Sequence, residues 1–434
     1  MNSKEFTRRR KQLMDMVGAG GIVIQPAAPV RLRSRDVEYR FRQDSDFYYL
    51  TGFAEPDAVM VLAPEREQGE FLIFCRERDP EKELWDGSRS GPDGAIRDYG
   101  ADDAFPIDDI DDILPGVMES CSRVYYTMGQ YADFDARMAE WINSLRLREQ
   151  RGVHTPQEYV ALDHLLHDMR LYKSRAEISA MRKAAKVAVR AHKAAMQAVR
   201  PGLFEYEIEA EFANEFRRND AWMSYNPIVG GGANACTLHY VENRDQLRDG
   251  DLLLIDAGCE LDYYASDITR TLPVSGRFSP EQRAVYEIVY AAQLAAIEKT
   301  RKGNHWNDPH DAAVKVITKG LKDLGLLKGT VPRLIRDRAY QEFFMHRTGH
   351  WIGMDVHDVG DYKVGDKWRI LESGMVTTVE PGIYISARSK VARRWQNIGI
   401  RIEDDVAITS NGPDVLSKGL AKDPDDVEAM MQRT

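Results

Sequence analysis

The sequence predicts a two-domain α/β protein, with an N-terminal unit of residues 1–170 and a larger unit of residues 171–434. A chain of 434 residues is long for one domain. In the first part, short apolar segments are separated by charged, glycine or proline-containing stretches, a pattern typical of an α/β unit. In the second part, helical patterns alternate with runs rich in β-branched residues. We therefore expect a curved antiparallel sheet there, with helices on its outer face.

The N-terminal unit is expected to begin with an amphipathic helix whose apolar side carries Phe6, Leu13 and Val17. The segment Asp102–Asp112 is too acidic for a core and is expected at the surface, and Pro156–Met169 has a helical pattern. Four short, apolar strands are expected at Gly21–Gln25, Ala58–Leu62, Phe71–Cys75 and Arg123–Thr127.

The second unit is expected to open with a long alanine-rich helix. Ser174 and Glu177 form a capping box at its start, and Pro201-Gly202 ends it. Further helices are expected at Glu205–Arg218, after Ser279 with Pro280 at the first helical position, and at Asp308–Leu324. The strands expected between the helices are Leu252–Asp256, Ile268–Pro273, Met375–Glu380 and Ile398–Ile402.

Five side chains with metal-binding chemistry occur on or near these strands. Taken singly, an acidic residue after a strand is more often a turn cap or a solvent-facing group. Four carboxylates and an imidazole cannot be crowded together without compensating positive charge, because the like-charged carboxylates raise each other's pKa values. Two divalent cations about 3.5–4 Å apart, holding a shared hydroxide, would supply that charge. The candidate ligands are Asp256, Asp267, His350, Glu380 and Glu403.

Four histidines stand in contexts that suggest the lining of a site: His239, His346, His350 and His357. His346 and His350 are four residues apart, so one helical turn would place both on one face. The alternative for any one of them is a buried histidine with satisfied hydrogen bonds, but the group favours a site.

Composition excludes several classes of protein. The formal net charge of −10 argues against nucleic acid as a partner. No apolar run is long enough for a membrane span, and no hydrophobic segment of a signal peptide follows Arg8–Lys11. Glu5 and Asp15 argue against a transit peptide. Four cysteines without metal-site spacing indicate buried thiols in a reducing compartment, so a cytoplasmic location is expected.

Several motifs carry a resemblance to a known family. They are Asp256-Ala-Gly, Ser266-Asp-Ile-Thr-Arg-Thr, the segment from His350 to Gly360, Val379-Glu-Pro-Gly-Ile-Tyr and Gly399-Ile-Arg-Ile-Glu-Asp-Asp. From Ser224 onward the chain resembles the Xaa-Pro aminopeptidases (aminopeptidase P), within the creatinase/methionine aminopeptidase "pita-bread" superfamily. Residues 39–53 and 169–174 resemble that family's creatinase-like N-terminal domain and its boundary.

The resemblance implies a role for each candidate. Asp256 would bind one metal through both oxygens, Asp267 and Glu403 would bridge two metals, and His350 and Glu380 would complete the second site. Glu380 would also carry a proton between the attacking hydroxide and the proline nitrogen. Further implied roles are substrate-carbonyl hydrogen bonds from His239 and His357, substrate contacts from His346, Tyr384 and Tyr225, and a supporting network of Arg401, Tyr384 and Asp36.

One nitrogen and several carboxylate ligands favour Mn²⁺, with Zn²⁺ or Co²⁺ as alternatives, and the resemblance also points to manganese. Arg347 and Thr348 depart from the small or apolar residues of bacterial relatives. Arg347 would either alter peptide-length preference or face solvent. The basic loop Ala387–Trp395 would either attract a peptide carboxylate or form an exposed turn, and we favour the turn.

The resemblance implies hydrolysis of peptides with a penultimate proline. The nearest alternative is an Xaa-Pro dipeptidase (prolidase), which would use the same metals. A methionine aminopeptidase would not need the long N-terminal unit, and creatinase-like chemistry would not need five ligands. A metal-free binding protein of the same fold would be expected to lose ligands. A homodimer or homotetramer is expected, in which Trp85 would either reach a neighbouring subunit's pocket or lie in the core.

Overall fold

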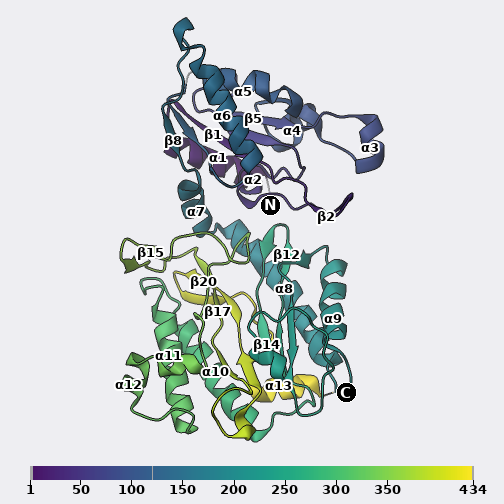
Figure 1. The fold of residues 1–434 in the computed structure, drawn as a ribbon, viewed down its shortest axis with the longest axis vertical. Coiled ribbons are helices and arrows are strands. Elements are labelled where there is room, and N and C mark those ends of the chain that lie inside the picture. Colours follow the sequence, from purple (N-terminus) through teal and green to yellow (C-terminus); the bar gives the residue numbers. More distant parts are fainter. Residues whose placement is uncertain (1–2, 120, 433–434) are drawn as a thin grey trace. The chain divides into compact units, whose positions relative to one another are not determined.

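The structure, a computed structural model, describes residues 3–119 and 121–432. The chain forms two compact units, Met1–His167 and Asp168–Thr434, which are coloured purple to blue and blue to yellow in Figure 1. Each unit has its own hydrophobic core. In the described part of the chain, no helix combines the length and the apolarity that a membrane crossing requires.

The N-terminal unit contains a six-stranded mixed sheet of order β6-β5-β4-β1-β7-β8. β1 is antiparallel to β4 and parallel to β7. Strands β1, β4 and β5 are wholly buried, and apart from Gln25 in β1 their residues are apolar. The strands are β1 (Gly21–Pro26), β4 (Val59–Leu62), β5 (Phe71–Cys75), β6 (Asp103–Pro106), β7 (Arg123–Tyr125) and β8 (Glu158–Val160), with a separate hairpin of β2 (Leu32–Ser34) and β3 (Val37–Glu38).

The helices of this unit confirm one prediction and correct two. Helix α1 buries Leu13 and Val17 as expected. The acidic segment 102–112 is not simply surface, because it forms β6 and begins α5, where Ile110 is fully buried. The segment 156–169 begins with strand β8, which pairs with β7 before α7 starts. The helices are α1 (Ser3–Val17), α2 (Ser45–Thr51), α3 (Pro80–Asp86), α4 (Gly91–Tyr99), α5 (Ile110–Met118) and α6 (Ala132–Arg146), and α7 (Asp163–Leu171) begins in this unit and ends in the second one, which starts at Asp168.

The second unit places antiparallel strands between two groups of helices (Figure 1). The hydrogen-bonded groups are β10-β11-β14, β13-β12-β9, β17-β20-β21 and β18-β19, with a small hairpin β15-β16. The strands are β9 (Trp222–Met223), β10 (Ile228–Gly231), β11 (Leu252–Asp256), β12 (Cys259–Leu261), β13 (Tyr264–Ala265), β14 (Thr269–Pro273), β15 (Lys363–Val364), β16 (Lys367–Trp368), β17 (Val376–Val379), β18 (Gly382–Ile385), β19 (Ile398–Arg401), β20 (Asp404–Thr409) and β21 (Gly412–Val415).

The four helices that the sequence predicts in the second unit begin at the predicted residues. The capping box of Ser174 and Glu177 is present at α8, and a second capping box with Pro280 at the first position opens α10. The helices are α8 (Arg175–Ala198), α9 (Glu205–Arg218), α10 (Pro280–Lys299), α11 (Asp308–Asp323), α12 (Val331–Arg336) and α13 (Pro424–Met431).

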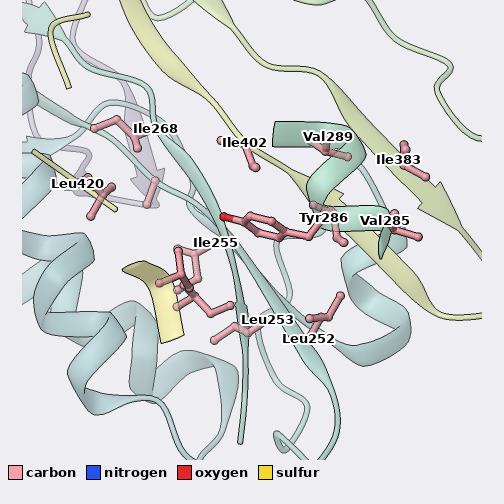
Figure 2. Close-up of a cluster of buried hydrophobic side chains, with 14 of the residues drawn as sticks. Leu252, Leu253, Ile255, Ile268, Val285, Tyr286, Val289, Ile383, Ile402 and Leu420 are labelled. Carbon is pink, nitrogen blue, oxygen red and sulfur yellow. The ribbon is translucent and has the colours of Figure 1, made fainter. Parts of the chain in front are cut away.

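The core of the second unit joins α10 to the strands that carry the acidic residues (Figure 2). Tyr286 of α10 is fully buried, close to Leu253 and Ile255 of β11, and its hydroxyl donates to the backbone oxygen of Lys422, 3.1 Å away. Full burial of a large aliphatic side chain contributes about 1.5–3 kcal/mol. This packing holds the strand ends, and therefore the site, in place.

Candidate metal centre and substrate pocket

The four carboxylates all lie at ends of strands. Asp256 is the last residue of β11, and Glu380 directly follows β17. Asp267 shortly precedes β14, and Glu403 lies between β19 and β20. The backbone N–H of Glu403 donates to the carbonyl of Thr269, 3.1 Å away, which links the two neighbouring strands. Strand pairing therefore brings together acids that are far apart in sequence.

His350 reaches the site on an irregular segment, so the predicted helical turn through His346 and His350 is wrong. The segment runs beside β17 instead, and the N–H of Thr378 donates to the carbonyl of His350 at 2.9 Å. A Cβ atom on Gly349 would lie 2.1 Å from the carbonyl oxygen of Thr378. Glycine is required there because the two backbones approach so closely.

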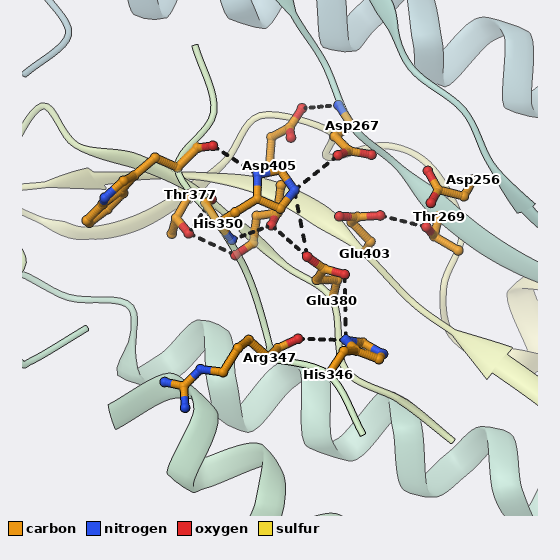
Figure 3. A network of polar contacts seen from close by, with 12 residues as sticks. Asp256, Asp267, Thr269, His346, Arg347, His350, Thr377, Glu380, Glu403 and Asp405 are labelled. Carbon is orange, nitrogen blue, oxygen red and sulfur yellow. Dashed lines mark hydrogen bonds and ion pairs between the residues drawn. The ribbon is translucent and has the colours of Figure 1, made fainter. Parts of the chain in front are cut away.

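The imidazole of His350 is oriented for metal binding (Figure 3). Its Nδ1 lies 2.9 Å from the carbonyl of Trp351, to which an Nδ1–H donates. The neutral ring then presents the Nε2 lone pair 3.3 Å from Oδ2 of Asp267 and 3.7 Å from Oε1 of Glu380. Ligand atoms of Asp267, His350 and Glu403 all lie within 4.8 Å of one another. A lone pair that faces carboxylates needs a proton or a cation between them.

The acid–base properties of the centre show the same need for positive charge. Burial raises the pKa of Asp256 to about 6 and that of Glu380 to about 7. Burial and the charge of Asp267 raise the pKa of Glu403 well above its usual value. Burial lowers the pKa of His350, but Asp267 and Glu380 together outweigh it and raise that pKa to about 9. The donor set therefore fits a divalent metal site, because cations would replace protons that the protein otherwise binds.

Arg401 links three groups around the carboxylates. Its Nη2 donates to Oδ2 of Asp256 at 2.5 Å, and its Nη1 donates to the hydroxyl of Tyr384 at 2.9 Å. Its Nε donates to the hydroxyl of Thr269 at 3.1 Å, and that hydroxyl donates to Oε2 of Glu403 at 2.6 Å. The guanidinium is buried and keeps its charge because of these partners.

Two other predicted residues are placed differently. The hydroxyl of Tyr225 lies 2.5 Å from Oδ1 of Asp256 and 2.6 Å from Oδ1 of Asp267, so it contacts the carboxylates themselves. Asp36 belongs to the N-terminal unit, in the exposed turn between β2 and β3. Its part in the network of Arg401 stays a prediction.

The carboxylates and His350 face a pocket of about 270 Å³. Three further histidines, His239, His346 and His357, also line this pocket. His239 and His357 are exposed, and the ring of His357 meets that of His350 edge to face, 4.3 Å between centroids. His346 accepts a hydrogen bond at Nε2 from the hydroxyl of Tyr384, 2.9 Å away, because its Nδ1 lies 2.6 Å from the carbonyl of Arg347. Tyr384 itself is buried behind the pocket.

The structure adds residues that the sequence reasoning missed. Thr269 lies two residues after Asp267, so the alternation of side chains along a strand was the available signal. Asp405 accepts a hydrogen bond from the backbone N–H of Asp267 at 3.2 Å. Asp404 is buried, and its carboxylate accepts hydrogen bonds of 2.6–2.8 Å from Arg270, Gln293, Ser417 and Lys422. These bonds secure the junction that carries Glu403.

The structure also shows where the basic loop and Arg347 lie. Arg388, Lys390, Arg393 and Arg394 are exposed, as the turn that we favour would have them, and attraction of a peptide carboxylate by this loop stays a prediction. The side chain of Arg347 is exposed, with its guanidinium 4.9 Å from the centroid of the Trp368 ring. Arg347 also lines the pocket, so its effect on peptide length stays a prediction.

A helix-flanked antiparallel sheet that gathers buried carboxylates and an imidazole around a pocket defines a metallohydrolase. Residues 179–410 match Metallopeptidase family M24, and residues 6–125 match the aminopeptidase P N-terminal domain. The chain belongs to metallopeptidase family M24. The predicted fold class, an N-terminal α/β domain followed by a pita-bread catalytic domain, is thereby confirmed.

Solved structures and curated proteins extend this result over the whole chain. The structure of Pseudomonas aeruginosa aminopeptidase PepP has a TM-score of 0.98 and 59% identity, over 99% of this chain and 98% of that one. The Xaa-Pro aminopeptidase of Escherichia coli is 42% identical over 99% of this chain and 98% of its own length. A zinc-substituted E. coli aminopeptidase P in complex with product has a TM-score of 0.97 and 42% identity, over 99% of this chain and 98% of that one.

Proposed function

We propose that this protein is an Xaa-Pro aminopeptidase, which hydrolyses the bond between an N-terminal residue and a penultimate proline. The observation that carries the proposal is the meeting of a metal-type donor set with three histidines around one pocket. Similarity along nearly the full length to Xaa-Pro aminopeptidases supports the substrate class. An E. coli aminopeptidase P with a substrate and one with the inhibitor Pro-Leu are also among the similar structures.

Two divalent ions, with Mn²⁺ favoured over Zn²⁺ or Co²⁺, would be held by five residues: Asp256, Asp267, His350, Glu380 and Glu403. Bound there, the ions would lower the pKa of a water and polarise the peptide carbonyl. The buried, mutually repelling carboxylates support this proposal, since they need compensating charge. The ligand set, rich in oxygen, favours manganese.

The remaining residues would handle substrate and protons. The Glu380 carboxylate, whose pKa burial raises to about 7, would accept a proton and return it to the proline nitrogen that leaves. His239 and His357 would donate hydrogen bonds to the scissile carbonyl as negative charge develops on its oxygen. Arg401 would hold Asp256 and Tyr384 in place while His346, backed by Tyr384, forms part of the pocket wall.

Metal removal tests the mechanism. We expect dialysis against a chelator to abolish hydrolysis of an Xaa-Pro-Pro peptide, and added Mn²⁺ to restore it. Full activity in protein shown to be metal-free by elemental analysis would contradict the metal-dependent mechanism and would favour a binding role for the fold.

A length series tests the substrate class. Xaa-Pro, Xaa-Pro-Yaa and longer peptides are assayed at matched concentrations, and release of the N-terminal residue is measured. An aminopeptidase hydrolyses the tripeptide and longer peptides. Hydrolysis of the dipeptide alone would identify an Xaa-Pro dipeptidase instead.

We also propose that the protein forms a homodimer or homotetramer and is located in the cytoplasm. Trp85 in α3 is 86% exposed, which excludes the core alternative and leaves this side chain available for a neighbouring subunit's pocket. The free thiols of Cys75, Cys121, Cys236 and Cys259 agree with a reducing compartment. Light scattering coupled to size-exclusion chromatography measures the mass of the assembly, and a monomer would contradict this part.

A further inference from the structure

The loop that carries His357 lacks regular secondary structure, so something other than a strand ladder must hold it. Residues 352–360 contain bends but no helix or strand. Three backbone bonds tie this loop to its neighbours. The N–H of Ile352 donates to the carbonyl of Val376 at 3.2 Å, the N–H of Ala265 donates to that of Gly353 at 2.8 Å, and the N–H of Asp358 donates to that of Trp351 at 2.9 Å. The His357 side chain is exposed in the pocket. Its direction therefore depends on how firmly the neighbouring residue is held.

That neighbour, Asp358, is held by two buried cations. Its Oδ1 accepts a hydrogen bond from Nη2 of Arg170 at 2.6 Å, and its Oδ2 accepts one from Nζ of Lys173 at 2.8 Å. The three side chains are only 1–3% exposed. Arg170 also donates to Asp355, at 2.7 Å, so it grips the loop at two points.

Asp358 and Lys173 are packed closely against the backbone of Gly353. A Cβ atom on Gly353 would lie 2.1 Å from Oδ2 of Asp358 and 2.8 Å from Cε of Lys173. The N–H of Lys173 donates to the carbonyl of Gly374 at 2.8 Å, which fixes the lysine from its backbone. Burial opposes ionisation of Asp358, but the charges of Lys173 and Arg170 outweigh it and hold the pKa of Asp358 below its usual value.

We propose that Lys173 and Arg170 are positioning residues for the peptidase reaction: by clamping Asp358 they aim His357 at the scissile carbonyl. The inference rests on the proposed function, in which His357 contacts the substrate. Neither cation lines the pocket, so both act through the loop. The clamp is needed because an imidazole displaced by about 1 Å can lose up to about 100-fold in rate.

Lys173→Met tests the clamp, since it removes one charge while Arg170 still pairs with Asp358. We expect kcat/KM for an Xaa-Pro-Yaa peptide to fall by about 10- to 100-fold, mainly through kcat, with unchanged metal content by elemental analysis. In a His357→Ala background the same substitution should have almost no further effect on kcat/KM, because the group that it positions is gone. Independent, multiplying losses would overturn the proposal.

Two further variants complete the test, one as an alternative to Lys173→Met and one as a control. Gly353→Ala displaces Asp358 without changing charge and should reproduce the pattern if Lys173→Met fails to fold. Arg182→Met removes a partly exposed cation of α8 that pairs with Asp414, and it should leave kcat/KM unchanged. Failure of wild-type protein to hydrolyse the peptide would contradict the proposed function rather than the clamp.

A spectroscopic measurement tests the clamp without requiring that the enzyme turn over substrate. In histidine-labelled protein, the ring signal of His357 is assigned by its loss in His357→Ala. Lys173→Met should shift or broaden this signal and leave that of His239 unchanged. A His357 signal unaffected by Lys173→Met and by Gly353→Ala would overturn the proposal.

Discussion

The two sides of the pocket are constructed differently. The carboxylates stand at strand ends, where backbone ladders such as the β11–β14 pairing set their positions. His239, His346 and His357 come from segments without helix or strand, so no strand ladder sets the directions of their side chains. His346 relies on Tyr384, and His357 on the clamp at Asp358.

The difference shows that the two sides of the pocket position their side chains by different means. The backbone at a strand end has its position set by many hydrogen bonds along the sheet, and Arg401 and Thr269 then fix the carboxyl groups that it carries. A loop side chain must be fixed by specific buried groups, and these are costly to disturb. We therefore expect damage on the carboxylate side to remove the metals, and damage on the histidine side to leave metals bound but chemistry slow.

The largest expected effect is on the carboxylate side. Asp267→Asn keeps the shape but removes a charge that faces His350 and Tyr225. We expect hydrolysis to fall by about 1000-fold or more, since several kcal/mol of metal-derived stabilisation is lost. Elemental analysis should show reduced metal content. Exposed Glu298→Gln is the matched control, and normal metal content in Asp267→Asn would contradict the division.

The next effect lies on the histidine side. His357→Ala should lower kcat by about 100- to 1000-fold, the usual loss for one hydrogen-bond donor to a developing oxyanion. Metal content should match wild type, because His357 contacts the ring of His350 without sharing its ligand position. Steady-state kinetics with elemental analysis measures both. A parallel loss of metal would remove the distinction between the two sides.

In metal-free protein, we expect the buried carboxylates to make the stability of the fold depend on pH. Folded-state pKa values of about 6 for Asp256 and about 7 for Glu380 lie above their usual values of 3.8 and 4.5. Raised acid pKa values mean that the folded state binds more protons, so their contribution to stability is present below about pH 4 and is lost as pH rises through about 7.

The loss is on the order of a few kcal/mol. Thermal unfolding of chelated and Mn²⁺-loaded protein measures it, and the gap in Tm should widen from pH 5 to pH 8. A gap that narrows over this range would show that the carboxylates are not the source of the instability.

The smallest expected effect is at the N-cap of α10, which belongs to neither side of the pocket. The hydroxyl of Ser279 accepts a hydrogen bond from the N–H of Gln282 at the start of α10, 3.2 Å away. Ser279→Ala should lower the free energy of unfolding by about 1 kcal/mol, the usual value of an N-cap. Activity should not change. Chemical denaturation measures the difference, with Ser279→Asp, another good cap, as the matched variant.

Local patterns predicted much of the fold. β5, β11 and α9 have the predicted bounds, because apolar runs, caps and proline signals are encoded in neighbouring residues. The prediction failed for β6 and β8, which are short strands whose sequences become strands only by pairing with β5 and β7. Their stability comes from partners distant in sequence, which no local pattern contains.

The sequence by itself determined the chemistry of the site: which residues carry carboxylates and imidazoles, and that their combined charge requires cations. Only the tertiary structure decided which groups support them. The pairs Arg401–Asp256 and Lys173–Asp358 join positions 145 and 185 residues apart. Such pairs form when folding removes water from charges that sequence alone leaves solvated, so the physical reason lies in burial and strand register.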